Sequence, residues 1–171
     1  MDHLARHRGL LRAALPAREF FPAPLGRVES DALAGRIRDH FGEHGFGLWA
    51  LEVRETGEFV GFTGLVWQTF PAHFTPAVEV GWRLARRAWG KGYATEAARA
   101  ALGHGFAVVG LDEIVSMAAV GNTRSRRVME RIGMTRDPGD DFDHPNVDAA
   151  SPLRRHVLYR ITGALVASDW P

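Results

Sequence analysis

One short segment combines residue types and spacing that suit phosphate binding. Arg87, Gly90 and Gly92 form the pattern R-x-x-G-x-G in a basic turn. Glycines allow the backbone shapes that turn several N–H groups toward one point. A helix that starts directly after such a turn adds unpaired N–H donors and partial positive charge. The segment therefore predicts a phosphate-binding loop. The alternative is an ordinary strand-to-helix turn in which the glycines only shape the backbone.

The residues on either side predict the two elements that would position this loop. Residues 78–84 alternate apolar with polar or small side chains, which indicates a strand. From about Gly90 onward, small and apolar residues recur at helical spacing. The loop is not a Walker loop, because Tyr93 follows its second glycine. It also lacks the third glycine of a dinucleotide-binding fingerprint.

A second motif, NTRSRRVMERIGM, follows about thirty residues later at residues 122–134. Asn122 is a good helix N-cap, and Ser125 would occupy the third helical position. Together the two motifs resemble the GNAT superfamily of acetyl-CoA-dependent N-acetyltransferases. Its patterns are Q/R-x-x-G-x-G/A and N-x-x-S-x-x-V-x-E-K-x-G-M/F, with Arg131 here in place of the lysine. The wider run EVGWRLARRAWGKGYATEA looks like the RimJ/RimL branch, the ribosomal-protein N-terminal acetyltransferases and their relatives.

The resemblance implies a fold and a reaction. We expect a single α/β domain over residues 1–171, with a mixed, largely antiparallel sheet that is split at the central strand and flanked by helices. The implied reaction is direct acetyl transfer from acetyl-CoA to a primary amine, either a protein N-terminal α-amine or a small-molecule amine. The chain has no cysteine, so a thiol nucleophile is excluded. The alternative is a non-catalytic acyl-CoA-binding or regulatory module on the same fold.

The resemblance also implies which residues meet acetyl-CoA. Main-chain amides of the loop would bind the pyrophosphate, and Arg86, Arg124, Arg126 and Arg127 are further basic residues within reach. Asn122 would contact the pantetheine arm, with Ser125 near the thioester sulfur. The expected cofactor-binding residues are Val80, Trp82, Leu84, Arg87, Gly90, Lys91, Gly92, Tyr93, Ala94, Thr95, Asn122 and Ser125.

Glu79 and Ser125 are the candidate catalytic residues. Acyl transfer needs a neutral amine, a stabilised oxyanion and an exit for the thiolate. Glu79 could accept the amine proton through water, because burial would raise its pKa. Alternatively, it points outward and pairs with Arg83 or another arginine. Ser125 could donate a hydrogen bond to the thiolate, or it could serve only in helix capping. Backbone N–H groups near residues 80–82 would meet the oxyanion, as the resemblance implies.

The acceptor side is expected to include an irregular aromatic loop. Residues 68–76 contain two prolines and two phenylalanines, which disfavour a strand. Such a loop beside the central strand can cover the reaction from water. The segment with Asp141, Asp143 and His144 is either a solvated acidic loop or part of the amine pocket. The expected pocket residues are Trp67, Phe70, His73 and Phe74.

No metal site is expected. His40 and His44 have i, i+4 spacing, but Gly42 between them is predicted to end the helix, and no third ligand is evident. That helix would begin at Ser30 or Glu29 and stop near Gly42 to Gly45. The remaining patterns predict a hairpin of residues 46–53 and 58–66, and strands at residues 112–120 and 155–161.

Residues 1–24 show no strand pattern, so the first strand of the family is either missing or diverged. A missing strand would leave a sheet edge that a second copy could cover. The net charge of +1 gives no reason to expect a nucleic-acid partner. No apolar run is long enough to span a membrane, so we expect a cytoplasmic protein.

Overall fold

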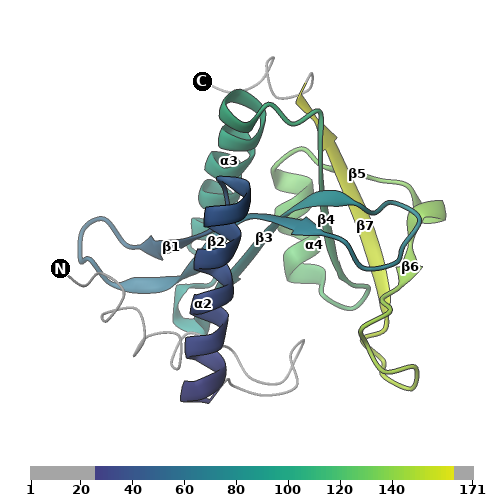
Figure 1. Cartoon of the computed structure of the whole chain (residues 1–171), viewed down its shortest axis with the longest axis horizontal. Coiled ribbons are helices and arrows are strands. Elements are labelled where there is room, and N and C mark those ends of the chain that lie inside the picture. Colours follow the sequence, from purple (N-terminus) through teal and green to yellow (C-terminus); the bar gives the residue numbers. More distant parts are fainter. Residues whose placement is uncertain (1–25, 164–171) are drawn as a thin grey trace.

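The computed structural model describes residues 26–163, which form a seven-stranded sheet with helices on both faces (Figure 1). The strand order is β1-β2-β3-β4-β7-β5, and β6 also pairs with β7. Every strand pair is antiparallel except β3 with β4, so the predicted mixed, largely antiparallel sheet is confirmed. The elements are α2 (Arg27–His44), β1 (Leu48–Glu52), β2 (Phe59–Gln68), β3 (Ala77–Leu84), the 3-10 turn η1 (Arg86–Ala88), α3 (Tyr93–His104), the π-helical turn η2 (Gly105–Val109), β4 (Glu113–Ala119), α4 (Thr123–Arg131), β5 (Thr135–Arg136), the 3-10 turn η3 (Pro138–Asp140), β6 (Phe142–Asp143) and β7 (Arg155–Thr162).

The sheet is open between its two parallel strands. β3 pairs with β2 along its whole length, but it pairs with β4 only at Glu79 and Val115. Beyond this pair, the Ser116 hydroxyl donates a 2.9 Å hydrogen bond to the carbonyl oxygen of Val80. This bond satisfies a buried backbone acceptor where the ladder between β3 and β4 is not continued.

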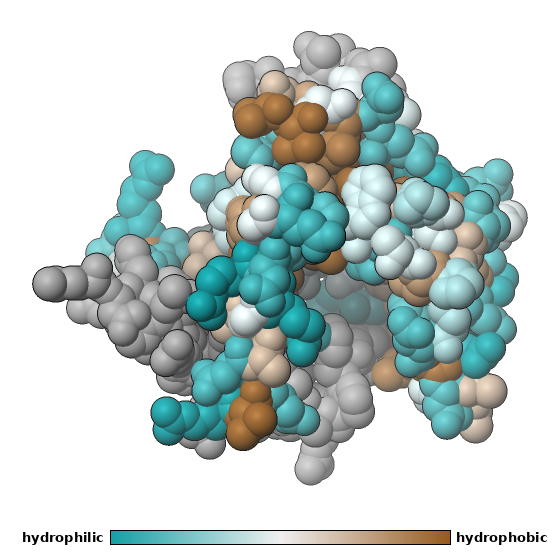
Figure 2. All heavy atoms as spheres, in the orientation of Figure 1, coloured by the Kyte–Doolittle hydropathy of each residue, from teal (hydrophilic) through white to brown (hydrophobic). Residues whose placement is uncertain are grey.

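Helices cover the two faces of the sheet and place the main core on one of them. Leu102 of α3 and Met129 of α4 are fully buried against Val80 and Ile114. On the opposite face, α2 contributes Ala34 to a smaller apolar cluster. Figure 2 shows mostly hydrophilic residues along the outward side of α2. Because successive side chains of β3 point to opposite faces of the sheet, each residue of β3 faces either α3 and α4 or α2.

The first described helix begins slightly earlier than its sequence predicts and ends within the predicted range of Gly42 to Gly45. α2 continues through Gly42 to His44, so only the prediction that Gly42 breaks the helix is wrong. It ends at Gly45, which takes a left-handed conformation with φ 74°. His40 is held at both ring nitrogens, 2.8 Å from the Phe46 carbonyl and 3.0 Å from the Trp67 amide nitrogen. These long-range bonds outweigh the roughly 1 kcal/mol cost of a glycine inside a helix.

The N-terminal expectations cannot be compared with this fold, because residues 1–24 lie outside the described residues. The proposed first strand and the sheet edge that a second copy could cover therefore stay predictions. Between residues 26 and 163, no helix combines the length and the apolar character needed to cross a membrane.

Gly64 of β2 gives a test of the register between β1 and β2. Its φ is 152°, and a Cβ there would stand 2.0 Å from the Gly47 carbonyl oxygen. Strain and overpacking together predict that Gly64→Ala lowers the free energy of unfolding by about 3 kcal/mol in urea titrations. Gly35 of α2 is the matched control, because no described atom lies within 4 Å of its Cβ position. Gly35→Ala should stabilise by about 0.5–1 kcal/mol, and equal effects at both sites would contradict this account.

Candidate active site

A pocket of about 640 Å³ lies between the N-terminal ends of α3 and α4, beside the open part of the sheet. Its walls come from the end of β3, the turn that follows, the first turn of α3 and one side of α4 as far as Arg131. Nine residues predicted to bind a cofactor line it together. They are Trp82, Leu84, Gly90, Gly92, Tyr93, Ala94, Thr95, Asn122 and Ser125.

The turn before α3 is shaped by two left-handed glycines. Gly90 and Gly92 have φ values of 75° and 86°, a conformation that side chains disfavour. The Trp89 indole N–H donates a 2.9 Å hydrogen bond to the Leu84 carbonyl, which fastens the turn to the end of β3. The Gly92 carbonyl accepts the first helical bond from the Thr95 amide at 2.9 Å. The helix therefore begins in the pocket wall, where its first N–H groups need outside partners.

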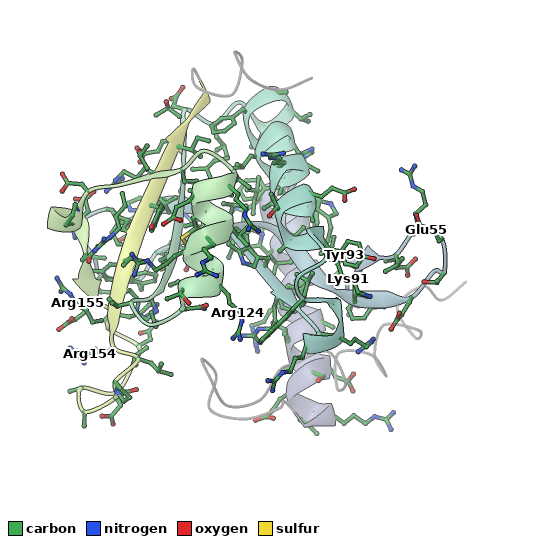
Figure 3. All side chains as sticks on the ribbon, turned by 180° about the vertical axis from the view of Figure 1, so that it is seen from behind. Glu55, Lys91, Tyr93, Arg124, Arg154 and Arg155 are labelled. Carbon is green, nitrogen blue, oxygen red and sulfur yellow. The ribbon has the colours of Figure 1, made fainter. Side chains whose placement is uncertain are left out.

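Arginines give the pocket a basic lining. Arg86, Arg127 and Arg131 lie in its walls. The Arg124 guanidinium stands 4.8 Å from the centre of the Trp89 ring and so links the start of α4 to the turn before α3. Figure 3 shows Arg124 at the start of α4, with Tyr93 and Lys91 near the start of α3. Cationic side chains and two helix N-termini together suit a ligand with several phosphate groups.

Three predicted cofactor-binding residues, Arg87, Val80 and Lys91, are not among the residues that line the pocket. Arg87 forms a 2.6 Å ion pair with Glu58 and also donates to the Phe59 carbonyl, so its guanidinium is held by β2 and the hairpin. Val80 is buried in the core, and Lys91 is exposed. Neither belongs to the pocket lining described above.

Five residues that line the pocket were not predicted to belong to it: Arg83, Ala88, Trp89, Val128 and Arg131. Trp89 lies inside the loop motif, where its aromatic ring was a visible signal. Arg131 stands at the position where the family pattern has lysine, so its basic character was visible as well. Arg126, in contrast, turns away and donates to the Val120 carbonyl at 3.2 Å.

Asn122 and Ser125 have separate roles at the start of α4. The Asn122 side-chain oxygen accepts a 3.1 Å hydrogen bond from the Ser125 amide, so Asn122 caps the helix. The cap uses the backbone of Ser125 and leaves its hydroxyl out of the capping bond. Since Ser125 also lines the pocket, its hydroxyl can act on a ligand without disturbing the helix.

Glu79 lies on the opposite face of β3 from Val80 and is partly buried. Its carboxylate accepts hydrogen bonds from the Gln68 amide group, at 2.5 Å, and from the Met117 amide. Burial raises the pKa of Glu79 to about 7, although both hydrogen bonds act in the other direction. The alternative of an outward pair with Arg83 does not describe this arrangement. A carboxyl group with this pKa can exchange protons near neutral pH.

The aromatic loop lies on the same face as Glu79. Phe70 and Phe74 surround Phe142, with ring-centre distances of 6.2 and 4.9 Å. This cluster packs on Val115 and Met117 of β4. Three of the four expected acceptor-side residues, Phe70, His73 and Phe74, are thus brought together.

Trp67 instead lies over α2, where its ring stacks on His44 at 6.2 Å. Phe142 also lies beside the aromatic loop, and the His156 ring stands 5.8 Å from Phe142. No local pattern indicates these neighbours, because they come from distant segments. Burial lowers the pKa of His156, which favours its neutral form. The part of the chain that the structure describes contains no cluster of three or more side chains suited to a metal ion.

Curated relatives match about half of this chain. It is 43% identical over 91 residues to the uncharacterised protein YkkB of Bacillus subtilis, covering 53% of this chain and 52% of that protein. It is 37% identical over 95 residues to the FsC-acetyl coenzyme A-N(2)-transacetylase of Aspergillus fumigatus, covering 53% and 40%. The matched segment thus spans about half or less of the length of these relatives.

The fold has a close counterpart among solved structures. A Bordetella pertussis protein assigned to the GNAT acetyltransferases superposes with a TM-score of 0.72 at 22% identity, covering 91% of this chain and 87% of that one. At this identity the likeness concerns the fold. The sequence comparison is more specific, because residues 6–135 match the family described as the acetyltransferase (GNAT) domain. That match covers well over half of the chain, which therefore belongs to the GNAT family of acetyltransferases.

Proposed function

We propose that the protein is an N-acetyltransferase that transfers an acetyl group directly from acetyl-CoA to a primary amine. The observation that carries the proposal is the basic pocket at two helix N-termini, placed where β3 and β4 part. A carboxylate with a pKa of about 7 lies on the other face of the same strand. The name of the Aspergillus relative gives acetyl coenzyme A and a nitrogen position, in agreement with this donor and this type of acceptor.

The cofactor would bind along the split. Its pyrophosphate would meet the amides at Gly92 and the start of α3, while its thioester would point between β3 and β4. Alternate residues of a strand direct their N–H and C=O groups to the same edge. Because the Val80 carbonyl faces β4, the Trp82 amide faces the same edge, where the strands have separated. That amide could stabilise the oxyanion of the tetrahedral intermediate.

Glu79 and Ser125 would then handle the protons. Glu79, acting through water, would take a proton from the incoming ammonium or from the tetrahedral intermediate. Ser125 would donate a hydrogen bond to the departing thiolate. A base with a pKa near 7 suits an α-amine, which titrates near 8, better than a lysine amine near 10.4. The EVGWRLARRAWGKGYATEA run supports a RimJ/RimL-like cytoplasmic enzyme, with peptide α-amines and small amines as the two acceptor classes to compare.

Release of free thiol from acetyl-CoA in the presence of an amine panel tests the reaction itself. Thiol release that depends on amine is expected. Binding of acetyl-CoA without thiol release would instead favour the non-catalytic acyl-CoA-binding module.

Gly92→Val is expected to weaken acetyl-CoA binding at least tenfold in calorimetry. Valine disfavours φ 86° and would distort the turn that presents the helix amides. Gly110→Val is the matched control, because Gly110 has φ 77° but lies beyond η2 at the other end of α3. Both variants should lose similar stability. An affinity loss common to both would contradict a specific role for the turn.

Glu79→Gln is expected to lower kcat about 100-fold and to remove the dependence of rate on a group titrating near pH 7. The wild-type rate should rise with pH through about 7, because the working base is the carboxylate. Its folded pKa lies above its unfolded value of 4.5, so its favourable contribution to stability is lost as pH rises toward 7. Thermal unfolding should therefore show Glu79→Gln gaining stability relative to wild type between pH 4 and pH 8. An unchanged pH–rate profile would exclude Glu79 as the base.

Ser125→Ala is expected to lower kcat about tenfold, the loss of one hydrogen bond to a charged group, with acetyl-CoA affinity unchanged. Asn122→Ala is the comparison, because it should cost about 1 kcal/mol of stability through loss of the cap. Steady-state kinetics and urea unfolding of both variants separate the two roles. Full activity in Ser125→Ala would leave Ser125 with a structural role only.

A further inference from the structure

The side chains of Gln68 on β2 and Glu79 on β3 are hydrogen-bonded to each other across the sheet. The Gln68 Nε2 group donates a 2.5 Å hydrogen bond to the Glu79 Oε2 atom. Val66 is the cross-strand partner of Glu79, so Gln68 stands at the diagonal position two residues further along β2, on the same face of the sheet. Diagonal neighbours are within reach of long side chains. The contact therefore follows from the register of β2 and β3.

The Glu79 carboxylate receives its hydrogen bonds from donors on both neighbouring strands. Gln68 of β2 donates from its side chain, and Met117 of β4 donates from its backbone N–H. An ionised carboxylate can only accept hydrogen bonds, so both contacts favour the ionised form. They act against burial, which raises the pKa of Glu79 to about 7. Without these donors the pKa would lie higher still, and the group would be mostly protonated at neutral pH.

Other titratable side chains lie on the elements around this face of the sheet. They are His40 of α2, His73 of the aromatic loop, Arg83 of β3, Asp140 of η3, His144 after β6, and His156 of β7. His73 and Asp140 stand 3.4 Å from each other. The raised pKa of Glu79 results from burial and the two hydrogen bonds. Because Met117 uses its backbone, Gln68 supplies the side-chain contact that a substitution can remove.

Resting on the proposed acetyl transfer, we propose that Gln68 is a positioning residue for this reaction, because its side-chain amide holds the Glu79 carboxylate in the orientation and charge state needed to take a proton from the acceptor amine. Gln68 is also the last residue of β2, directly before the aromatic loop with Phe70 and Phe74. The same hydrogen bond therefore connects the start of that loop to the candidate base.

The pH dependence of kcat, measured by thiol release at saturating acetyl-CoA, tests this role. Gln68→Met keeps a side chain of similar length and removes the donor, so the pKa of Glu79 should rise. The midpoint of the pH–rate curve should move upward by about one pH unit, and kcat at pH 6 should fall about tenfold, as expected for one hydrogen bond to a charged group. Near pH 9 kcat should change little. Gln68→Glu places a second carboxylate beside the first and should move the midpoint further upward.

Two controls separate this effect from a general loss of structure. Thr63→Val removes a different side-chain hydrogen bond between the same strands, the 2.9 Å bond from the Thr63 hydroxyl to the Gly81 carbonyl. It should lower stability and leave the midpoint unchanged. In the Glu79→Gln background, Gln68→Met should have little further effect on kcat at any pH. A carbon-13 NMR titration of the Glu79 carboxyl group, which does not depend on the reaction, should show the same upward shift in Gln68→Met.

The outcomes separate this inference from the proposed reaction. Thiol release by the wild type, combined with an unchanged midpoint in Gln68→Met or an equal loss of kcat at every pH, would overturn the inference and leave the acetyl transfer standing. A shift in the NMR titration without a shift in the rate curve would also overturn it, because Glu79 would then not be the working base. No thiol release by the wild type with any amine would remove both proposals.

Discussion

The single pairing of β3 with β4, at Glu79 and Val115, is the constraint on which the site depends. Backbone N–H and C=O groups need partners, and a parallel ladder would normally supply them along the whole strand. Here the Ser116 hydroxyl satisfies the Val80 carbonyl, and the strands then separate. The edge of β3 beyond this point is exposed to a ligand, with main-chain groups already oriented by the pairing of β3 with β2.

The alternation of side chains along β3 would let the two proposed substrates approach one strand from opposite faces. Trp82 and Leu84 line the pocket on the side of α3 and α4, whereas Glu79 faces the aromatic loop on the side of α2. The cofactor pocket and the candidate base are therefore separated by one layer of backbone. A donor and an acceptor can meet through the split without competing for the same space.

Local patterns predicted the elements and most of the pocket, and long-range contacts explain what they missed. The order strand, turn and helix around Gly92, and the cap at Asn122, depend on neighbours within a few residues, so spacing was sufficient. Arg87 forms an ion pair with Glu58, which lies in the connection between β1 and β2. Phe142 joins Phe70 only because β6 pairs with β7. The Glu79 carboxylate likewise accepts a hydrogen bond from the Met117 amide of a separate strand, and no spacing rule contains that information.

The distribution of arginines shows how a chain with a net charge of only +1 could bind the proposed anionic cofactor. Several arginines outside the pocket are committed to carboxylates, such as Arg136 to Asp141, and Arg160 to both Asp140 and Glu113. The opposite charges of each pair cancel locally, so these pairs contribute little to the long-range electrostatic field of the protein. The basic residues of the pocket come from β3, the turn that follows it and α4, and the N-termini of α3 and α4 in the pocket wall add partial positive charge. Affinity for phosphate then comes from short-range geometry, because a nearly neutral molecule provides little electrostatic steering at physiological ionic strength.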